Sequence, residues 1–145
     1  MKAVLALADG RIFQGKSFGA TGEATGIFSI AFRDAAHGVV VGGNYQRESD
    51  AIDNVAVTSD GGETWTRPAR GPAGFRSVAA WLPGPSPWLL AVGPSGADWS
   101  GDDGRTWQPA GGDGYDAFSA APAGAVGWAT GAGGRIARVT FGRPR

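Results

Sequence analysis

An eight-residue motif occurs twice in the chain and restricts the fold more than any other feature of the sequence. The first copy runs from Thr58 to Trp65 and the second from Ser100 to Trp107, so the two copies lie 42 residues apart. Both follow the pattern S/T-x-D-x-G-x-T-W. Aspartate and glycine at this spacing are typical of a tight turn. A period near 42 residues with Gly-rich turns is typical of propeller blades, each of which is a small antiparallel sheet.

Short apolar segments recur in the same order around the motif. They are 28–32 and 38–42 in a first unit, 75–81 and 88–93 in a second, and 117–120, 126–131 and 133–139 in a third. Each segment is bounded by Gly, Pro, Asp or Asn, a pattern that predicts strands. The sequence therefore predicts an all-β fold. We expect a partial β-propeller of about three four-stranded blades, with an N-terminal β-hairpin, and blades at 27–68, 74–109 and 115–141.

Each residue type in the motif has a structural role in a turn between the third and fourth strands of a blade. The aspartate accepts hydrogen bonds from backbone N–H groups, and the glycine supplies a positive φ. The threonine starts the outgoing strand, and the tryptophan fills the space between neighbouring sheets. The residues expected in these roles are Asp60, Gly62, Thr64 and Trp65 in the first copy and Asp102, Gly104, Thr106 and Trp107 in the second.

The motifs resemble the Asp-box (BNR) repeats of sialidases and of the photosystem II stability/assembly-factor propellers. Residues 127–138 are especially similar to two strands of the assembly-factor family, and the resemblance covers about 27–141. It implies a propeller fold but not one activity, since such propellers include both hydrolases and binding scaffolds. The resemblance to sialidases implies an arginine triad and a tyrosine nucleophile. Nothing in the sequence places three arginines around Tyr45 or Tyr115, so no catalytic residue is assigned.

Residues 1–26 do not fit the repeat. Apolar segments at 3–7 and 11–15 flank Asp9-Gly10, and Asp-Gly between strands is a strong hairpin signal. The sequence from Lys2 to Ala20, together with residues 22–26, resembles the start of the carbamoyl-phosphate synthase small subunit. That enzyme uses a cysteine nucleophile, and this chain has no cysteine, so no chemistry is carried over. Two unrelated resemblances that meet near Gly26 predict a chimera, whether designed, selected from recombined fragments or produced by a genomic fusion.

The number of blades predicts association between copies. About three blades are fewer than the four to eight of closed propellers, and an open row exposes apolar sheet faces and strand edges. Two arrangements would cover these faces and edges. In one, the N-terminal hairpin supplies an outer strand to the third blade; in the other, several chains complete one ring. We expect a homo-oligomer, with which completion by the hairpin is compatible.

A polar insertion at 44–54 is the candidate contact surface, since binding groups often lie on loops of a rigid scaffold. Tyr45, Arg47, Asp50 and Asp53 are the candidate ligand-binding residues. The alternative is a solvated loop whose charges pair with one another. The spacing of its acids matches no calcium-binding loop, and His37 is expected on an exposed turn. No metal ligand and no cofactor are assigned.

Composition excludes several functional classes. Thirteen basic residues balance thirteen acidic ones, which leaves no electrostatic footprint for nucleic acid or an anionic membrane surface. No segment reaches the ~20 apolar residues of a membrane span, and the apolar run at 3–8 is too short for the hydrophobic core of a signal peptide, so a cytoplasmic location is expected. We expect no enzyme, but a chimeric scaffold or binding module whose main property is folding and self-assembly. The alternatives are a natural protein-binding propeller related to assembly factors and, less favoured, a sialidase-like glycosidase fragment.

Overall fold

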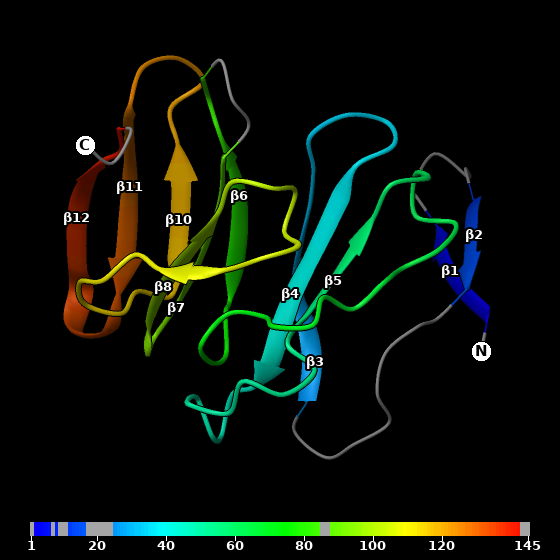
Figure 1. Cartoon of the computed structure of the whole chain (residues 1–145), viewed down its shortest axis with the longest axis horizontal. Coiled ribbons are helices and arrows are strands. Elements are labelled where there is room, and N and C mark those ends of the chain that lie inside the picture. The colour runs from blue at the N-terminus through cyan, green and yellow to red at the C-terminus, as the bar shows by residue number, and fades with distance from the viewer. Residues whose placement is uncertain (1, 7, 9–11, 17–24, 85–87, 143–145) are drawn as a thin grey trace.

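The computed structural model describes residues 2–6, 8, 12–16, 25–84 and 88–142. Within them the regular structure is almost entirely antiparallel β-sheet, with one short 3-10 helix, η1 (Ala132–Gly134). Three sheets follow one another in chain order, and a two-stranded hairpin lies beyond the first of them (Figure 1). The expected all-β class is confirmed, and the row of sheets without closure is a partial β-propeller.

The first and third sheets have three strands each, and the second has four. The first contains β3 (Thr25–Phe32), β4 (Gly38–Asn44) and β5 (Val55–Thr58). The second contains β6 (Val78–Leu82), β7 (Trp88–Gly93), β8 (Gly96–Ser100) and β9 (Gln108–Pro109). The third contains β10 (Ala117–Ala120), β11 (Val126–Gly131) and β12 (Arg135–Thr140).

The structure corrects the expectation of four strands in every blade. In the first sheet the fourth strand is reduced to a single bridge between Val57 and Thr66. In the third sheet, no fourth strand is found among the described residues. β3 begins at Thr25 and pairs Thr25 with Asn44, so the first sheet includes the last two residues of the N-terminal segment 1–26.

Apolar side chains fill the spaces between neighbouring sheets. We call the face of a sheet that points toward the next sheet its front face, and the opposite one its back face. The first core cluster packs Val39, Val41 and Val55, from the front of the first sheet, against Ala79, Leu89 and Ala91, from the back of the second. A second cluster joins the front of the second sheet to the back of the third and contains Leu82, Val92, Phe118 and Ala129.

The N-terminal hairpin forms a sheet of its own. It consists of β1 (Lys2–Ala6) and β2 (Ile12–Lys16), which pair from Lys2 with Lys16 to Ala6 with Ile12. The predicted Asp9-Gly10 turn lies outside the described residues. The hairpin lies on the side of the first sheet, at the opposite end of the molecule from β12 (Figure 1). Within one chain, the hairpin therefore does not complete the third sheet.

Candidate functional site

The first motif folds into a turn that its own side chains hold together; we call residues 58–65 the first box turn. The Thr58 hydroxyl accepts the Gly62 N–H at 2.9 Å and donates to Asp60 at 2.7 Å. The Asp60 carboxylate accepts the backbone N–H of Thr64 at 2.9 Å and the Thr64 hydroxyl at 2.5 Å. Trp65 Nε1–H donates to the Gly62 carbonyl at 3.1 Å. These contacts occupy both oxygens of the carboxylate within the turn.

The second box turn, residues 100–107, repeats these contacts residue for residue. Ser100 accepts the Gly104 N–H at 2.9 Å and donates to Asp102 at 2.8 Å. Asp102 accepts the Thr106 N–H at 2.8 Å and the Thr106 hydroxyl at 2.6 Å. Trp107 Nε1–H donates to the Gly104 carbonyl at 2.9 Å. Gly104 has φ +82° and Gly62 has φ +90°, a conformation that favours glycine at both positions.

The hydrogen bonds stabilise the charged form of both aspartates. They lower the pKa of Asp60 to about 2, with the Thr64 hydroxyl as the largest cause, followed by the Thr64 N–H. At Asp102, burial acts to raise the pKa, but the two hydrogen bonds from Thr106 and the one from Ser100 outweigh it, so the pKa is also lowered. The low pKa values favour carboxylates that stay ionised rather than groups that exchange protons near neutrality.

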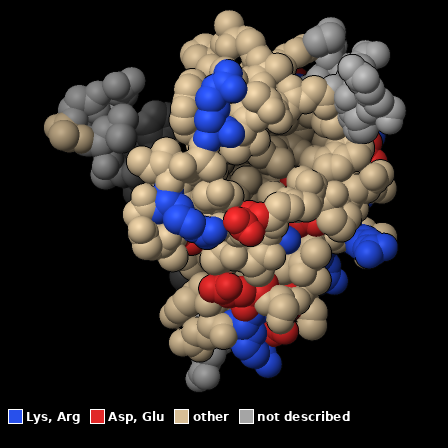
Figure 2. All heavy atoms as spheres, turned by 90° about the vertical axis from the view of Figure 1, so that its left-hand side faces the viewer, with Lys and Arg blue, Asp and Glu red and all other residues tan. Residues whose placement is uncertain are grey.

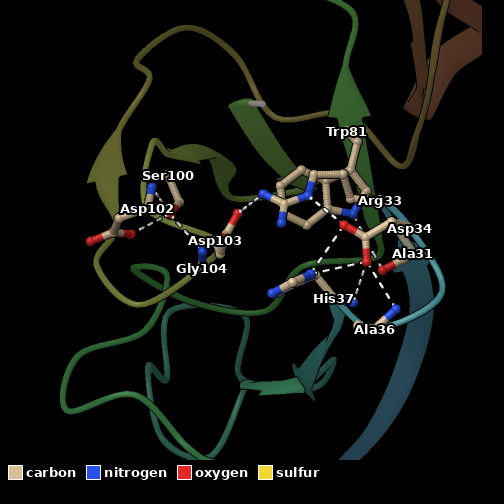
Figure 3. A network of polar contacts seen from close by, with 10 residues as sticks. All are labelled: Ala31, Arg33, Asp34, Ala36, His37, Trp81, Ser100, Asp102, Asp103 and Gly104. Carbon is tan, nitrogen blue, oxygen red and sulfur yellow. Dashed lines mark hydrogen bonds and ion pairs between the residues drawn. The ribbon is translucent and has the colours of Figure 1, made fainter. Parts of the chain in front are cut away.

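An ionic network crosses the boundary between the first and second sheets (Figure 3). Arg33, which follows β3, pairs with Asp103 of the second box turn and with Asp34. Its guanidinium lies 5.5 Å from the centre of the Trp81 ring, a cation–π distance. No local sequence pattern indicates this network, because residues 33 and 103 lie in different repeat units.

His37 is on a turn, as expected, but its side chain is only partly exposed and is bonded. Its Nδ1 lies 2.9 Å from an Asp34 oxygen, and that carboxylate also accepts the backbone N–H groups of Ala36 and His37 at 2.8 Å each. These bonds, led by that of the His37 N–H, hold the pKa of Asp34 well below its usual range. Asp34 therefore caps this turn as an ionised acceptor.

The candidate residues of the insertion divide into three separate contacts. Arg47 pairs with Asp50 at 3.1 Å on the protein surface. Asp53, which has a positive φ of 53°, pairs with Arg67 of the segment after the first box turn. The exposed Tyr45 contacts the edge of Phe28, with ring centres 6.1 Å apart. The loop therefore contains paired charges rather than one convergent cluster.

A groove lies beside the insertion and was not predicted. It has a volume of about 830 Å³ and is lined by residues 51–55 and 67–73, together with Asp98, Trp107 and Pro109. Asp98 is fully buried and accepts the Arg76 Nε–H at 2.8 Å, while Arg76 also donates to the Phe75 carbonyl at 2.7 Å. A buried pair with these extra hydrogen bonds is costly to break. Because Arg76 and Asp98 are 22 positions apart in the sequence, no local pattern indicates that they pair.

The residues that the structure describes contain no group of three or more His, Cys, Asp or Glu side chains placed to hold a metal ion. Arg135 lies over the ring of Tyr115, 4.9 Å from its centre, whereas the ring contact of Tyr45 is with Phe28. No helix in this part of the chain has the length and apolar character needed to cross a bilayer.

The two end faces of the row of sheets carry exposed apolar side chains. Ile30 and Phe32 lie on the back face of the first sheet and are 60% and 42% exposed. Trp128 and Ile136 lie on the front face of the third sheet and are 46% and 75% exposed. The side of the molecule that carries the third sheet is partly hollowed and carries both basic and acidic side chains (Figure 2); the exposed Arg138 lies beside Trp128 on this face. These faces are the strongest candidates for an interaction surface.

Comparisons with known proteins identify one short segment. The chain is 77% identical over 26 residues to the carbamoyl phosphate synthase small chain of Syntrophotalea carbinolica, which fits the N-terminal segment 1–26. The match covers 18% of this chain and 7% of that protein. No family model matches the chain, and no solved structure matches it. The N-terminal segment is therefore similar to a small piece of that synthase chain.

Proposed function

We propose that this chain is a non-enzymatic β-propeller scaffold of chimeric origin that associates with further copies of itself through its exposed sheet faces. The observation that carries the proposal is the pair of end faces, with Ile30 and Phe32 on one and Trp128 and Ile136 on the other. Apolar side chains of this size are worth about 1.5–3 kcal/mol each when fully buried. An exposed apolar sheet face is a typical docking surface.

The chemistry of the charged groups favours a scaffold over an enzyme. Asp60 and Asp102 accept hydrogen bonds from their own turns and have lowered pKa values. Asp98 is paired with Arg76. Each of these carboxylates is bonded within the fold, as expected for a structural role. The 26-residue similarity to an unrelated synthase chain supports the chimeric origin.

Light scattering on a size-exclusion column tests the proposal. We expect a species of at least twice the 14.7 kDa chain mass that dissociates on dilution. Ile136→Asp on the end face should shift the protein toward the monomer. Ile52→Asp is the matched control, because Ile52 is equally exposed, at 72%, but lies on the insertion. A monomer at every concentration up to the millimolar range would exclude self-association.

A protein-binding propeller is the second candidate. Tyr45, 51% exposed, and the 830 Å³ groove next to the same insertion favour it, since partners often bind exposed aromatic residues beside a groove. The distinguishing observation is a 1:1 complex with a different protein that Tyr45→Ala weakens. Self-association through the end faces should be unaffected by this variant.

A further inference from the structure

We infer that the joint between copies is head to tail: the front face of the third sheet of one copy packs on the back face of the first sheet of the next. The inference rests on the proposed function and specifies its partner, a second copy in a defined orientation. It follows from comparing each exposed residue with the residues at the same position in the two contacts between sheets inside one chain.

The central strands supply the alignment of the three sheets. Gly42, Gly93 and Gly131 occupy the same place in β4, β7 and β11, close to the residues that lead into the inner strand of each sheet. A Cβ at Gly42 or Gly93 would overlap the carbonyl oxygen of Gly26 or Phe75, at 1.8 and 2.2 Å. A Cβ at Gly131 would lie against Tyr115 at 3.3 Å. Residues that lie the same number of positions before each of these glycines are therefore equivalent in the three sheets.

The front-face positions are buried in the first sheet and exposed in the third. Three residues before the glycine stand Val39, which is buried, Leu90, which packs against the third sheet, and Trp128, which is 46% exposed. On the neighbouring strand the equivalents are Val55, Ala97 and Ile136, each paired with the residue just before the glycine. Val55 is 5% exposed, whereas Ile136 is 75% exposed. The front face of the third sheet is therefore exposed, whereas the equivalent faces of the first and second sheets are covered by the sheet that follows them.

The inner-strand positions of the back face show the reverse gradient along the chain, whereas Val40, on the central strand of the same face of the first sheet, is buried. The inner-strand residues paired two positions before the glycine are Ile30, Ala79 and Phe118. Ala79 and Phe118 are 6% and 9% exposed because the preceding sheet covers them, but Ile30 is 60% exposed. Two residues further along the same inner strands, Trp81 and Ala120 are partly buried, while Phe32 is 42% exposed. The two-stranded hairpin lies beyond the first sheet, but it leaves Ile30 and Phe32 exposed. This apolar back face is the complement of the front face of the third sheet.

This complementarity favours contact between unlike faces. Both contacts inside the chain join a front face to a back face, so a third contact of the same kind continues an interface that the fold already uses. Two copies of three sheets joined this way at both ends would give a closed ring of six, within the four-to-eight range of propellers. An unlike-face contact that closes into a ring also leaves no free end.

Two single variants, mixed, test the orientation. Ile30→Arg blocks the back face of the first sheet, and Ile136→Arg blocks the front face of the third. Both positions are more than half exposed, so the fold should tolerate each change; circular dichroism and the melting temperature check this. In a head-to-tail joint, each variant alone has lost both of its contacts and runs as a 14.7 kDa monomer. In the equimolar mixture, the unchanged front face of Ile30→Arg can bind the unchanged back face of Ile136→Arg, so the mass should double.

Each other result has a definite meaning. If one variant alone remains a dimer, copies join through like faces, and the head-to-tail inference is wrong while self-association stands. If both variants are monomers and the mixture also stays monomeric at millimolar concentration, the two faces do not bind each other, and the inference is likewise overturned. A wild-type chain that is itself monomeric overturns the proposed function instead.

Discussion

The two box turns make the same hydrogen bonds but have different surroundings. In the second turn, Gly104 and Trp107 are buried, and a Cβ at Gly104 would lie 2.8 Å from Val57 of the first sheet. In the first turn, Trp65 is partly exposed and contacts Phe32, itself exposed on the back face, with ring centres 6.1 Å apart. The second turn lies between two sheets, whereas the first lies at the end of the row.

The hydrogen bonds of the two turns are local, whereas the burial of their tryptophans depends on the tertiary structure. The bonds from Thr58 or Ser100 to the aspartate, and from the aspartate to the threonine, join residues within eight positions of one another. They form wherever the motif occurs. The burial of Trp107 depends on the first sheet, which the chain places against it. The same motif should therefore contribute unequally to stability at its two locations.

The largest expected difference comes from removing the two tryptophans. Trp107→Ala should lower the free energy of unfolding by about 3–5 kcal/mol, the range for removing a buried aromatic side chain. Trp65→Ala should cost less than half as much, because its side chain is only partly buried. Urea unfolding monitored by circular dichroism measures both changes. It should be done at a concentration where the chain is monomeric. Equal losses would contradict the comparison.

The glycines of the two box turns differ in how closely other side chains pack against them. Gly62→Ala and Gly104→Ala suffer the same strain from a positive φ, but the added methyl meets different neighbours. At Gly62 the nearest atom is 3.6 Å away, an ordinary contact, whereas at Gly104 it is Val57 at 2.8 Å. We expect Gly104→Ala to cost about 1–3 kcal/mol more than Gly62→Ala, the range for overpacking. Val57→Ala combined with Gly104→Ala should reduce that excess, which thermal melting can measure.

The charged state of the turns predicts a loss of stability in acid. The pKa of Asp60 falls from its ordinary value of 3.8 to about 2 in the folded protein, and the pKa values of Asp102 and Asp34 are also lowered. A lowered folded pKa stabilises the protein above the unfolded value, and that contribution is lost as pH falls from about 4 toward 2. The melting temperature should therefore drop across this window. Asp60→Asn should flatten the drop, and an unchanged slope would contradict the role of Asp60.

The smallest effect is expected on the insertion. Arg47→Ala with Asp50→Ala removes an exposed ion pair, of a kind that is typically worth well under 1 kcal/mol. The melting temperature should change by no more than about 2 °C, far less than for Trp107→Ala. A larger change would show that this pair supports the fold. A binding role for the loop would appear as weakened capture of a partner with unchanged melting.

Much of the fold could be predicted because its signals are local. Strand segments such as 38–42, 88–93 and 126–131 lie within β4, β7 and β11, and the insertion at 44–54 separates two strands as predicted. The fourth strands were the exception. At Thr66 the strand is reduced to one bridge, because pairing there needs a partner as well as strand propensity.

The candidate residues were less predictable than the strands. Arg67 pairs with Asp53, and Arg33 pairs with Asp103, 70 positions along the chain. Such pairs form where the packing of the sheets brings two loops together, and the spacing of the residues in the sequence does not indicate which loops will meet. The same holds for the buried Arg76–Asp98 pair.

The all-β class, the two turns and their internal hydrogen bonds can be predicted from the sequence, because they depend on neighbouring residues and on the alternation of side chains along a strand. Which apolar faces are covered depends instead on how the sheets pack against one another. Val39 and Trp128 occupy the same place in two sheets, but one is buried and the other exposed. The difference arises because a sheet has two faces, and the front face of the third sheet is not covered by a further sheet of the described residues.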